Sequence, residues 1–450
     1  MEFVSASSPR LDGCSCESSS AHLAARPCVV GDGSRPERLV AARCARIVRA
    51  MSLDDDARTE LAALEAAHRL RVPRVVESRQ GATFVLDGRE VINLSSNDYL
   101  SLAGDPRIAR AGIAAMERVG VGAGASRLIS GTHRAHVELE RAVGDWMRCD
   151  GVRLFNSGYA ANTGVLATLL RAGDAVFSDE LNHASIIDGC RLSRANVVVY
   201  PHLDVSALDD ALARSTAPRK IVVTESLFSM DGDIADLGAI SSVCKRRDAS
   251  LVVDEAHAVG AWGPEGRGIA ADAAIAPDVV IGTFGKALGT FGAFAATTRA
   301  IADLLWNRAR SFVFSTALPP AIPAATLAAI EIVRGDEGLD RRRRLAANAR
   351  AFRELVPRAG GARESAIAPV RVDSSRESSA NDVRANDVRA NDAHASDARV
   401  MELTAQLLAR GVFAQGIRPP TVPEGTARVR VSLASGHSLE QLQRSADLLR

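Results

Sequence analysis

The chain has 450 residues, of which 47% are hydrophobic and 24% are charged, so it is long enough for two or three domains with sizeable cores. Its formal net charge of +1 gives no electrostatic basis for binding nucleic acid or a membrane surface. No apolar run reaches the roughly 20 residues of a membrane span, and the seven cysteines show no metal-binding spacing. We therefore expect a cytoplasmic protein with reduced thiols, and no nucleic acid, membrane or metal partner.

Residues 1–50 differ in composition from the rest of the chain. They are rich in Ser, Arg and Cys, show no helical or strand periodicity, and contain no continuous apolar segment of a secretory signal. We expect a disordered extension, or a start codon set too early with Met51 as the true first residue. The Arg-rich, acid-poor composition leaves a transit peptide as the alternative.

Two amphipathic helices are predicted in the first third of the chain. One begins at Asp55, within an N-terminal arm over residues 51–100. Its apolar stripe is Leu61, Leu64, Ala67 and Leu70. The second helix is predicted over residues 133–148. Its candidate core positions are Val137, Leu139, Val143 and Trp146.

A large domain over residues 101–330 alternates short apolar strands with helical stretches. The predicted strands are 152–155, 175–177, 197–200, 221–224, 251–254, 279–283 and 292–296. Such alternation, with continuously apolar strands, is typical of a mostly parallel sheet that helices cover on both faces. The sequence therefore predicts an α/β fold.

After about residue 330 the pattern changes to helix, strand, helix, strand, helix, which predicts a smaller α+β domain over 331–450. This part contains a five-residue repeat that runs in four copies from Ala380 to Arg399. Because a period of five matches neither helix nor strand, we expect a solvated, low-complexity surface insertion over 374–399. The alternative is a repeat that binds a partner.

Polar residues follow four of the predicted strands at their carboxyl ends, which is where ligands bind in parallel sheets. In strand order the pairs are Ser157 and Gly158, Glu225 and Ser229, Asp254 and His257, Thr283 and Lys286. A lysine amine, a carboxylate and a hydroxyl/glycine turn are the groups that pyridoxal phosphate requires for its aldehyde, its ring nitrogen and its phosphate. The sequence thus predicts a pyridoxal phosphate site at this edge.

Taken one at a time, some of these motifs also fit different roles. Asp254 to His257 spells a helicase signature, but the G-x-x-x-x-G-K-[ST] loop that it needs is missing, because Lys286 is followed by Ala. Taken alone, Asp254 also fits the role of a helix N-cap. Gly158 fits an ordinary strand-to-helix turn, and His183 fits a histidine buried in the core. Arg428 and Arg430 fit a solvated strand face, and the alternative is that one of them binds a substrate carboxylate.

Seven motifs together resemble the α-oxoamine synthase family of fold-type I pyridoxal phosphate enzymes. They are residues 95–100, 131–133, 158–162, 182–185, 224–233, 254–257 and 283–286. The resemblance covers about residues 55–450 and implies a seven-stranded large domain with a smaller C-terminal domain. It also implies a homodimer with the active site at the subunit interface.

The resemblance implies a role for each matched residue. Lys286 is expected to bind the cofactor as a Schiff base and then to act as general base. Asp254 is expected to keep the ring nitrogen protonated, His257 to bond the ring hydroxyl, His183 to stack on the ring and Ser229 to orient it. The expected phosphate contacts are Gly158, Tyr159, Thr283 and, from one subunit to the other, Thr316.

The substrate contacts are also inferred from the resemblance. Arg430 is expected to bind the carboxylate of the amino acid. Arg69 and Arg418 are expected to line the acyl-thioester path, and Thr421 is a further expected substrate-binding residue. Residues 417–430 are most similar to family members that condense L-alanine with a pimeloyl thioester, carried on coenzyme A or acyl carrier protein. The alternatives are a glycine- or serine-using member and a catalytically silent regulatory partner, against which the intact Lys286 argues.

Overall fold

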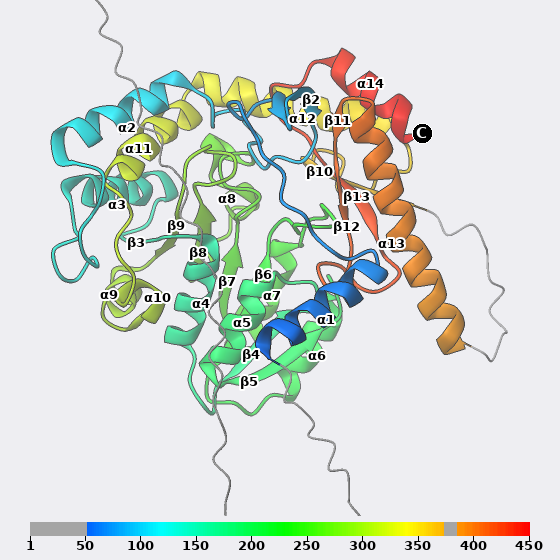
Figure 1. The fold of residues 1–450 in the computed structure, drawn as a ribbon. Helices are drawn as coiled ribbons and strands as arrows, with labels where there is room; N and C mark the ends of the chain where they lie inside the picture. Colours follow the sequence, from blue (N-terminus) through cyan, green and yellow to red (C-terminus); the bar gives the residue numbers. More distant parts are fainter. Residues whose placement is uncertain (1–51, 373–384) are drawn as a thin grey trace, which may run out of the picture. The chain divides into compact units, whose positions relative to one another are not determined.

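The computed structural model describes residues 52–372 and 385–450, with only the backbone described for 385–394. Helix α1 (Leu53–Ala66) lies at the start of the described chain, and the described residues from Ala57 onward pack as one unit. The centre of this unit is a seven-stranded sheet in the order β3-β9-β8-β7-β6-β4-β5 (Figure 1). Its strands are β3 (Gly151–Phe155), β4 (Ala175–Asp179), β5 (Asn196–Tyr200), β6 (Lys220–Glu225), β7 (Ser250–Asp254), β8 (Val279–Thr283) and β9 (Ala293–Thr297).

The sheet is mostly parallel, as predicted. Only β9 runs antiparallel to its two neighbours, β3 and β8, whereas the other four pairings are parallel. Successive residues of a strand point to opposite faces, and both faces here are apolar. Val252 and Val253, for example, are 1% and 0% exposed and belong to two different core clusters. The predicted α/β fold is therefore confirmed.

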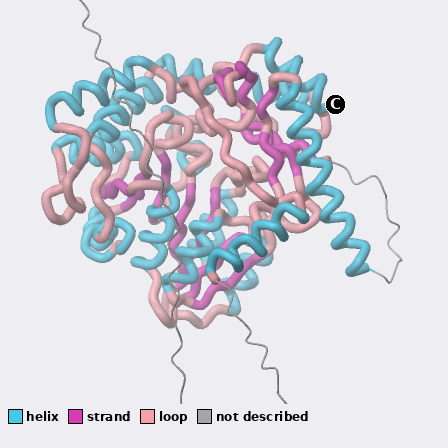
Figure 2. Tube along the Cα trace, in the orientation of Figure 1, coloured by secondary structure: helices cyan, strands magenta, loops and turns pink. Residues whose placement is uncertain are grey.

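Helices cover both faces of this sheet (Figure 2). The core cluster on one face contains residues of α4 (Gly158–Leu169), α5 (Ala184–Ser193), α9 (Arg299–Arg308) and α10 (Arg310–Val313). The core cluster on the other face contains residues of α3 (Arg134–Met147), α6 (Val205–Arg214), α7 (Leu237–Arg246), α8 (Ile269–Asp272) and α11 (Ala321–Arg334). Helix α2 (Pro106–Val119) packs on α11.

A smaller C-terminal domain follows α11, which confirms that part of the predicted fold. Its helices are α12 (Asp336–Leu355), α13 (Ala385–Ala409) and α14 (Leu439–Leu449). Strands β10 (Ile367–Arg371), β13 (Arg428–Ser432) and β12 (Gln415–Ile417) form an antiparallel sheet in that order. In a second sheet, β11 (Val412–Phe413) pairs with β2 (Arg89–Asn93), which also pairs with β1 (Thr83–Leu86). The N-terminal arm thus joins the C-terminal domain through this sheet.

The repeat differs from the solvated loop that the sequence predicted. Helix α13 includes the last three copies, and near its middle Ser396 and Asp397 are 4% and 0% exposed. The buried Val400 anchors the next turn, and extending a packed helix into an Ala-rich segment is easier than nucleating one. The loop prediction is therefore wrong for residues 385–399, whereas residues 374–384 lie outside the described part of the chain.

No residue of α1 is fully buried: Leu61 of its apolar stripe is 51% exposed, whereas Leu64 is partly buried. One predicted core position of the next amphipathic helix is wrong. In α3, Leu139 is fully buried but Val137 is 53% exposed. Val137 lies two residues before Leu139, which turns its side chain by about 200° to the opposite side of the helix.

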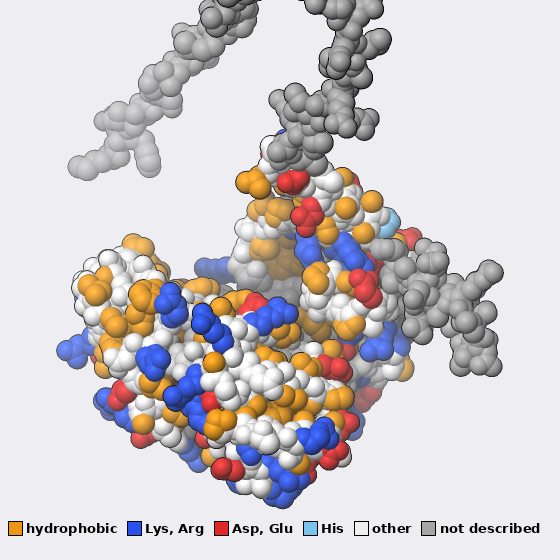
Figure 3. Space-filling view, turned by 90° about the horizontal axis from the view of Figure 1, so that it is seen from below, with side chains coloured by type: hydrophobic (Ala, Val, Ile, Leu, Met, Phe, Trp, Pro, Cys, Tyr) orange, Lys and Arg blue, Asp and Glu red, His pale blue; other side chains and the backbone are white. Residues whose placement is uncertain are grey.

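Within the described residues, none of the helices combines the length and the apolar composition needed to cross a membrane. Basic and acidic side chains both appear across the face shown in Figure 3.

Candidate active site

A cavity of about 260 Å³ lies where the carboxyl ends of the central strands face the small domain. Its lining residues are Ser95, Asn97, His183, Ser229, Met230, His257, Lys286, Gln415, Ile417 and Arg430. Five of them, His183, Ser229, Met230, His257 and Lys286, follow β4, β6, β7 or β8, because the carboxyl ends of parallel strands meet at one edge of a sheet. The structure therefore brings together five residues that the sequence singled out: His183, Ser229, His257, Lys286 and Arg430.

Lys286 follows a tight turn at the end of β8. Thr283 Oγ1 accepts a hydrogen bond from the Gly285 amide at 3.2 Å and donates one to the Gly292 carbonyl at 3.0 Å. Gly289 has φ +66°, and a Cβ there would lie 2.3 Å from the Ala103 amide nitrogen. Only glycine tolerates both conditions, so the turn that presents Lys286 depends on it.

The Lys286 amine lies 2.7 Å from His257 Nε2. Burial lowers the pKa of Lys286 to about 8, although the nearby carboxylates of Asp254 and Glu225 favour its charged form. A lysine with a lowered pKa has a larger neutral, nucleophilic fraction near neutral pH. Burial also lowers the pKa of His257 well below its usual value, with Lys286 as the second cause, so this ring is neutral.

Asp254, 6% exposed, lies at the end of β7 behind the cavity wall. Its Oδ1 accepts a hydrogen bond from the Ala256 amide at 2.8 Å, and its Oδ2 accepts one from Asn162 Nδ2 at 2.7 Å. Asn162 Nδ2 also donates to Ser185 Oγ, which lies 2.7 Å from His183 Nδ1. This network fixes the carboxylate and the His183 ring together.

The polar groups around Asp254 fit a site for pyridoxal phosphate. Asn162 Oδ1 and Glu225 Oε1 are buried acceptors without a hydrogen-bond partner among the described residues. Burial, followed by the charge of Asp254, raises the pKa of Glu225 to about 8. A carboxylate accepts about four hydrogen bonds, and Asp254 accepts two here, so it retains capacity for a protonated ring nitrogen.

The two arginines of β13 have different partners. Arg428 is 2% exposed, pairs with Asp231 and does not line the cavity. Arg430 does line it, and donates to the Ser229 carbonyl at 2.6 Å and to Asn97 Oδ1 at 3.3 Å. Both are buried, so the solvated strand face is excluded. Of the two, Arg430 is the one whose side chain lines the cavity.

The other three expected substrate-binding residues form a separate group. Arg69 donates to Asp397 at 2.9 Å and to Glu424 at 2.5 Å, whereas Arg418 donates to the carbonyl of His68. Thr421 is exposed and accepts a long, 3.5 Å hydrogen bond from Arg71. None of the three lines the cavity, although Ile417, next to Arg418, does.

The expected phosphate contacts are also dispersed. Gly158 begins α4, where backbone N–H groups are available to an anion. Tyr159 is 47% exposed and donates to Asp188. Thr283 orders the Lys286 turn, and neither it nor Tyr159 lines the 260 Å³ cavity.

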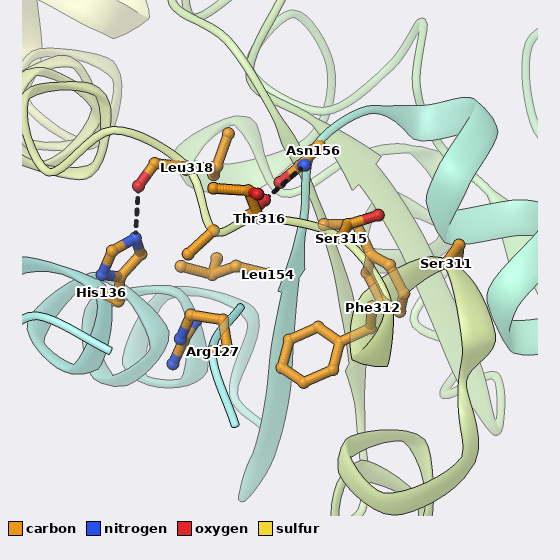
Figure 4. Close-up of a pocket in the computed structure, with 11 residues that line it drawn as sticks. Arg127, His136, Leu154, Asn156, Ser311, Phe312, Ser315, Thr316 and Leu318 are labelled. Atoms are coloured by element: carbon orange, nitrogen blue, oxygen red, sulfur yellow. Dashed lines mark hydrogen bonds between the residues drawn. The ribbon is translucent and has the colours of Figure 1, made fainter. Parts of the chain in front are cut away.

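Thr316 lines a different and much smaller cavity of about 10 Å³ (Figure 4). Its carbonyl accepts a hydrogen bond from Asn156 Nδ2 at 2.9 Å, and His136 Nε2 lies 2.8 Å from the Leu318 carbonyl nearby. Such a volume holds about one water molecule. Within one chain, Thr316 is therefore not part of the Lys286 site.

Sequence reasoning gave no role to Asn97, Tyr99 or Asn162. Asn97 lines the cavity, Asn162 bonds Asp254, and Tyr99 Oη lies 2.7 Å from His257 Nδ1. All three belong to motifs that carried the family resemblance. For Asn162, a polar residue within a mostly apolar helix was the available signal, whereas Asn97 and Tyr99 stand in a polar loop, and only the fold shows what each of them faces.

Comparison with known proteins defines the class. The aminotransferase class I and II family model matches residues 89–449, and the chain belongs to this family. A serine palmitoyltransferase from S. paucimobilis, solved with a bound PLP–myriocin adduct, has a TM-score of 0.78 and 31% identity, covering 88% of this chain and 96% of its own. The fold is thus that of fold-type I enzymes.

Within the class, the chain is similar to enzymes named 8-amino-7-oxononanoate synthase. That of Geobacter metallireducens is 45% identical over 396 residues, which cover 87% of this chain and 96% of the relative. That of Geotalea daltonii is 43% identical over 397 residues, covering 87% and 95%. A solved 8-amino-7-oxononanoate synthase from Francisella tularensis has a TM-score of 0.65 and 28% identity, covering 80% and 96%.

Proposed function

We propose that this chain is an acyltransferase that condenses L-alanine with a pimeloyl thioester and releases 8-amino-7-oxononanoate, CO2 and the free thiol, a step of biotin synthesis. Pyridoxal phosphate is its cofactor. The observation that carries the proposal is the single cavity in which Lys286, His257 and Arg430 meet. Relatives that are 42–45% identical carry this activity in their names, whereas the serine palmitoyltransferase structures are 31% identical.

We assign a different chemical role to each residue in or next to the cavity. Bound pyridoxal phosphate supplies an electron sink for negative charge at the amino acid Cα. Lys286 provides the amine that holds the cofactor and, with a pKa near 8, a base that accepts a proton. Asp254 holds a proton at the ring nitrogen, and Arg430 binds the carboxylate of the amino acid through its guanidinium.

The proposal includes a homodimer with the active site at the subunit interface, in which Thr316 reaches the phosphate site of the other subunit. Large apolar side chains on the surface support it, because a subunit interface would remove them from water. Ile129 is 80% exposed and Phe314 is 73% exposed. We also propose domain boundaries near residues 100 and 330. A cytoplasmic location is proposed as well, because Cys190 and Cys244 are free thiols.

An assay with defined substrates tests the proposal. L-alanine is offered with pimeloyl-CoA or with pimeloyl acyl carrier protein, and CO2 and free thiol are measured together. We expect equal amounts of both, and neither product from the Lys286→Ala variant. If glycine or L-serine with another acyl thioester reacts much faster, the family assignment holds and the biotin-pathway assignment fails. If no pair reacts, the chain is not a synthase.

A further inference from the structure

Tyr99 does not line the cavity itself, but its hydroxyl contacts three residues that do: Asn97, His257 and Arg430. It lies in the loop after β2, is 0% exposed and has no assigned role. Its hydroxyl oxygen is 2.7 Å from His257 Nδ1, 3.1 Å from Asn97 Oδ1 and 3.5 Å from Arg430 Nη2. One hydroxyl therefore contacts the histidine next to Lys286 and the two residues of the carboxylate site.

The chemistry of these partners determines which atom carries each proton. Arg430 only donates, and the Asn97 oxygen, which faces two Arg430 nitrogens at 3.3 Å, only accepts. Tyr99 has one proton, and its contact with Asn97 Oδ1 requires that proton. His257 Nδ1 must then carry its own hydrogen and donate it to the Tyr99 oxygen. His257 Nε2 is left with a lone pair, which accepts a hydrogen bond from the Lys286 amine at 2.7 Å.

This assignment affects the nucleophile. When Lys286 donates an N–H to His257 Nε2, the lone pair of the neutral amine stays free. In the opposite tautomer, Nε2–H would donate into that lone pair. The amine needs the lone pair to form a C–N bond with the aldehyde carbon of the cofactor, a reaction that releases water.

We propose that Tyr99 is a positioning residue that holds neutral His257 in its Nδ1–H tautomer and thereby keeps the Lys286 amine free to react with the cofactor aldehyde. The link to the cofactor rests on the proposed function, whereas the tautomer does not. Tyr99→Phe is the natural test, since it keeps the ring and removes only the hydroxyl. Tyr200→Phe is the matched control, because Tyr200 is also buried, at 3% exposure, and, unlike Tyr99, makes no contact with His257 among the described hydrogen bonds.

The first measurement is ¹⁵N NMR of the imidazole nitrogens in the full-length chain freed of cofactor. Nine histidines are present, and His257→Gln assigns the relevant signals. We expect a protonated Nδ1 and an unprotonated Nε2 at His257 in the unmutated chain and in Tyr200→Phe, and the reverse in Tyr99→Phe. A protonated Nε2 in the unmutated chain would overturn the proposal, and this spectrum decides the tautomer even if Tyr99→Phe does not fold.

The second measurement is the rate at which the cofactor-free chain takes up pyridoxal phosphate, followed by absorbance. We expect Tyr99→Phe to load about tenfold more slowly, the effect of one hydrogen bond of ordinary strength, and Tyr200→Phe to load at the normal rate. Unchanged loading in Tyr99→Phe would refute the role assigned to the tautomer. If the unmutated chain takes up no cofactor, the proposed function fails, and the NMR spectrum still decides the tautomer.

Discussion

Asp254 and Glu225 are two buried carboxyl groups at neighbouring strand ends, paired in register, with different surroundings. Asp254 accepts two hydrogen bonds, whereas Glu225 Oε1 has no partner among the described residues and burial raises the pKa of Glu225 to about 8. One group is thus suited to hold a proton at a ring nitrogen, and the other stays largely protonated at neutral pH. Two carboxyl groups in neighbouring, paired positions therefore differ in their surroundings.

Replacing Asp254 with Asn tests this division. We expect the variant to retain the cofactor through Lys286 but to lose turnover by roughly 10²-fold, because an amide cannot hold the ring proton electrostatically. Cofactor absorbance and steady-state rates measure the two effects separately. Asp236→Asn, which exchanges one good N-cap of α7 for another, is the control and should keep its activity. Turnover close to normal in Asp254→Asn would transfer the role to Glu225.

At the scale of helices and strands, the sequence predicted the elements whose formation depends on residues close together in the chain. The apolar runs of β3 to β9 were visible because a strand buried on both faces needs them. The carboxyl-end residues Asp254 and Lys286 followed from the parallel topology. In contrast, α13 is fixed by contacts such as the one between Arg69 and Asp397, which are 328 residues apart. Tyr99 and His257 are 158 residues apart. Pairings of this kind have no signature in a single sequence.

The ion pair of α13 is expected to stabilise the helix on the N-terminal arm. Asp397→Ala removes a fully buried partner of Arg69, and we expect the free energy of unfolding to fall by about 1–3 kcal/mol in urea denaturation. Asp340→Ala is the control, because its pair with Arg343 is mostly exposed and should change stability by less than about 0.5 kcal/mol. Equal stability of the two variants would show that α13 is held by its apolar contacts alone.

His202 ties the loop after β6 to the end of β4. Its ring nitrogens lie 2.8 Å from Asp179 Oδ1 and 2.8 Å from Asp233 Oδ2. Burial opposes the charged ring, but the hydrogen bonds to these two carboxylates outweigh it and raise the pKa of His202 to about 10. The loop carries Ser229 and Met230 to the cavity wall, so His202 supports the site from behind.

A raised histidine pKa has a definite consequence for stability. The contribution of His202 should be complete below about pH 6.5, decline above it, and be lost as the pH rises through about 10. Urea denaturation at pH 6.5, 8 and 9.5 should therefore show falling stability in the unmutated chain and a smaller decline in His202→Gln. The same slope in both proteins would show that His202 is not the titrating group.

At the scale of the whole molecule, the proposed dimer accounts for apolar side chains that one chain leaves exposed. We expect Phe314→Asp to shift sedimentation towards the monomer and to lower turnover, because the partner then contributes nothing to the site. Leu192→Asp is the control, because Leu192 is a similarly exposed apolar residue, at 63% on α5, that the proposal does not assign to the interface, and it should leave both unchanged. A fully active monomer would contradict an active site shared between subunits.

The most direct test of the central claim uses the small number of lysines. The chain has three, Lys220, Lys245 and Lys286, so borohydride reduction of the cofactor-loaded protein followed by peptide mass spectrometry has three possible targets. We predict that the cofactor is fixed to Lys286 alone, and that L-alanine added before reduction prevents this labelling more effectively than glycine or L-serine. Labelling of Lys220 or Lys245, or labelling of Lys286 that L-alanine leaves unchanged, would contradict the account.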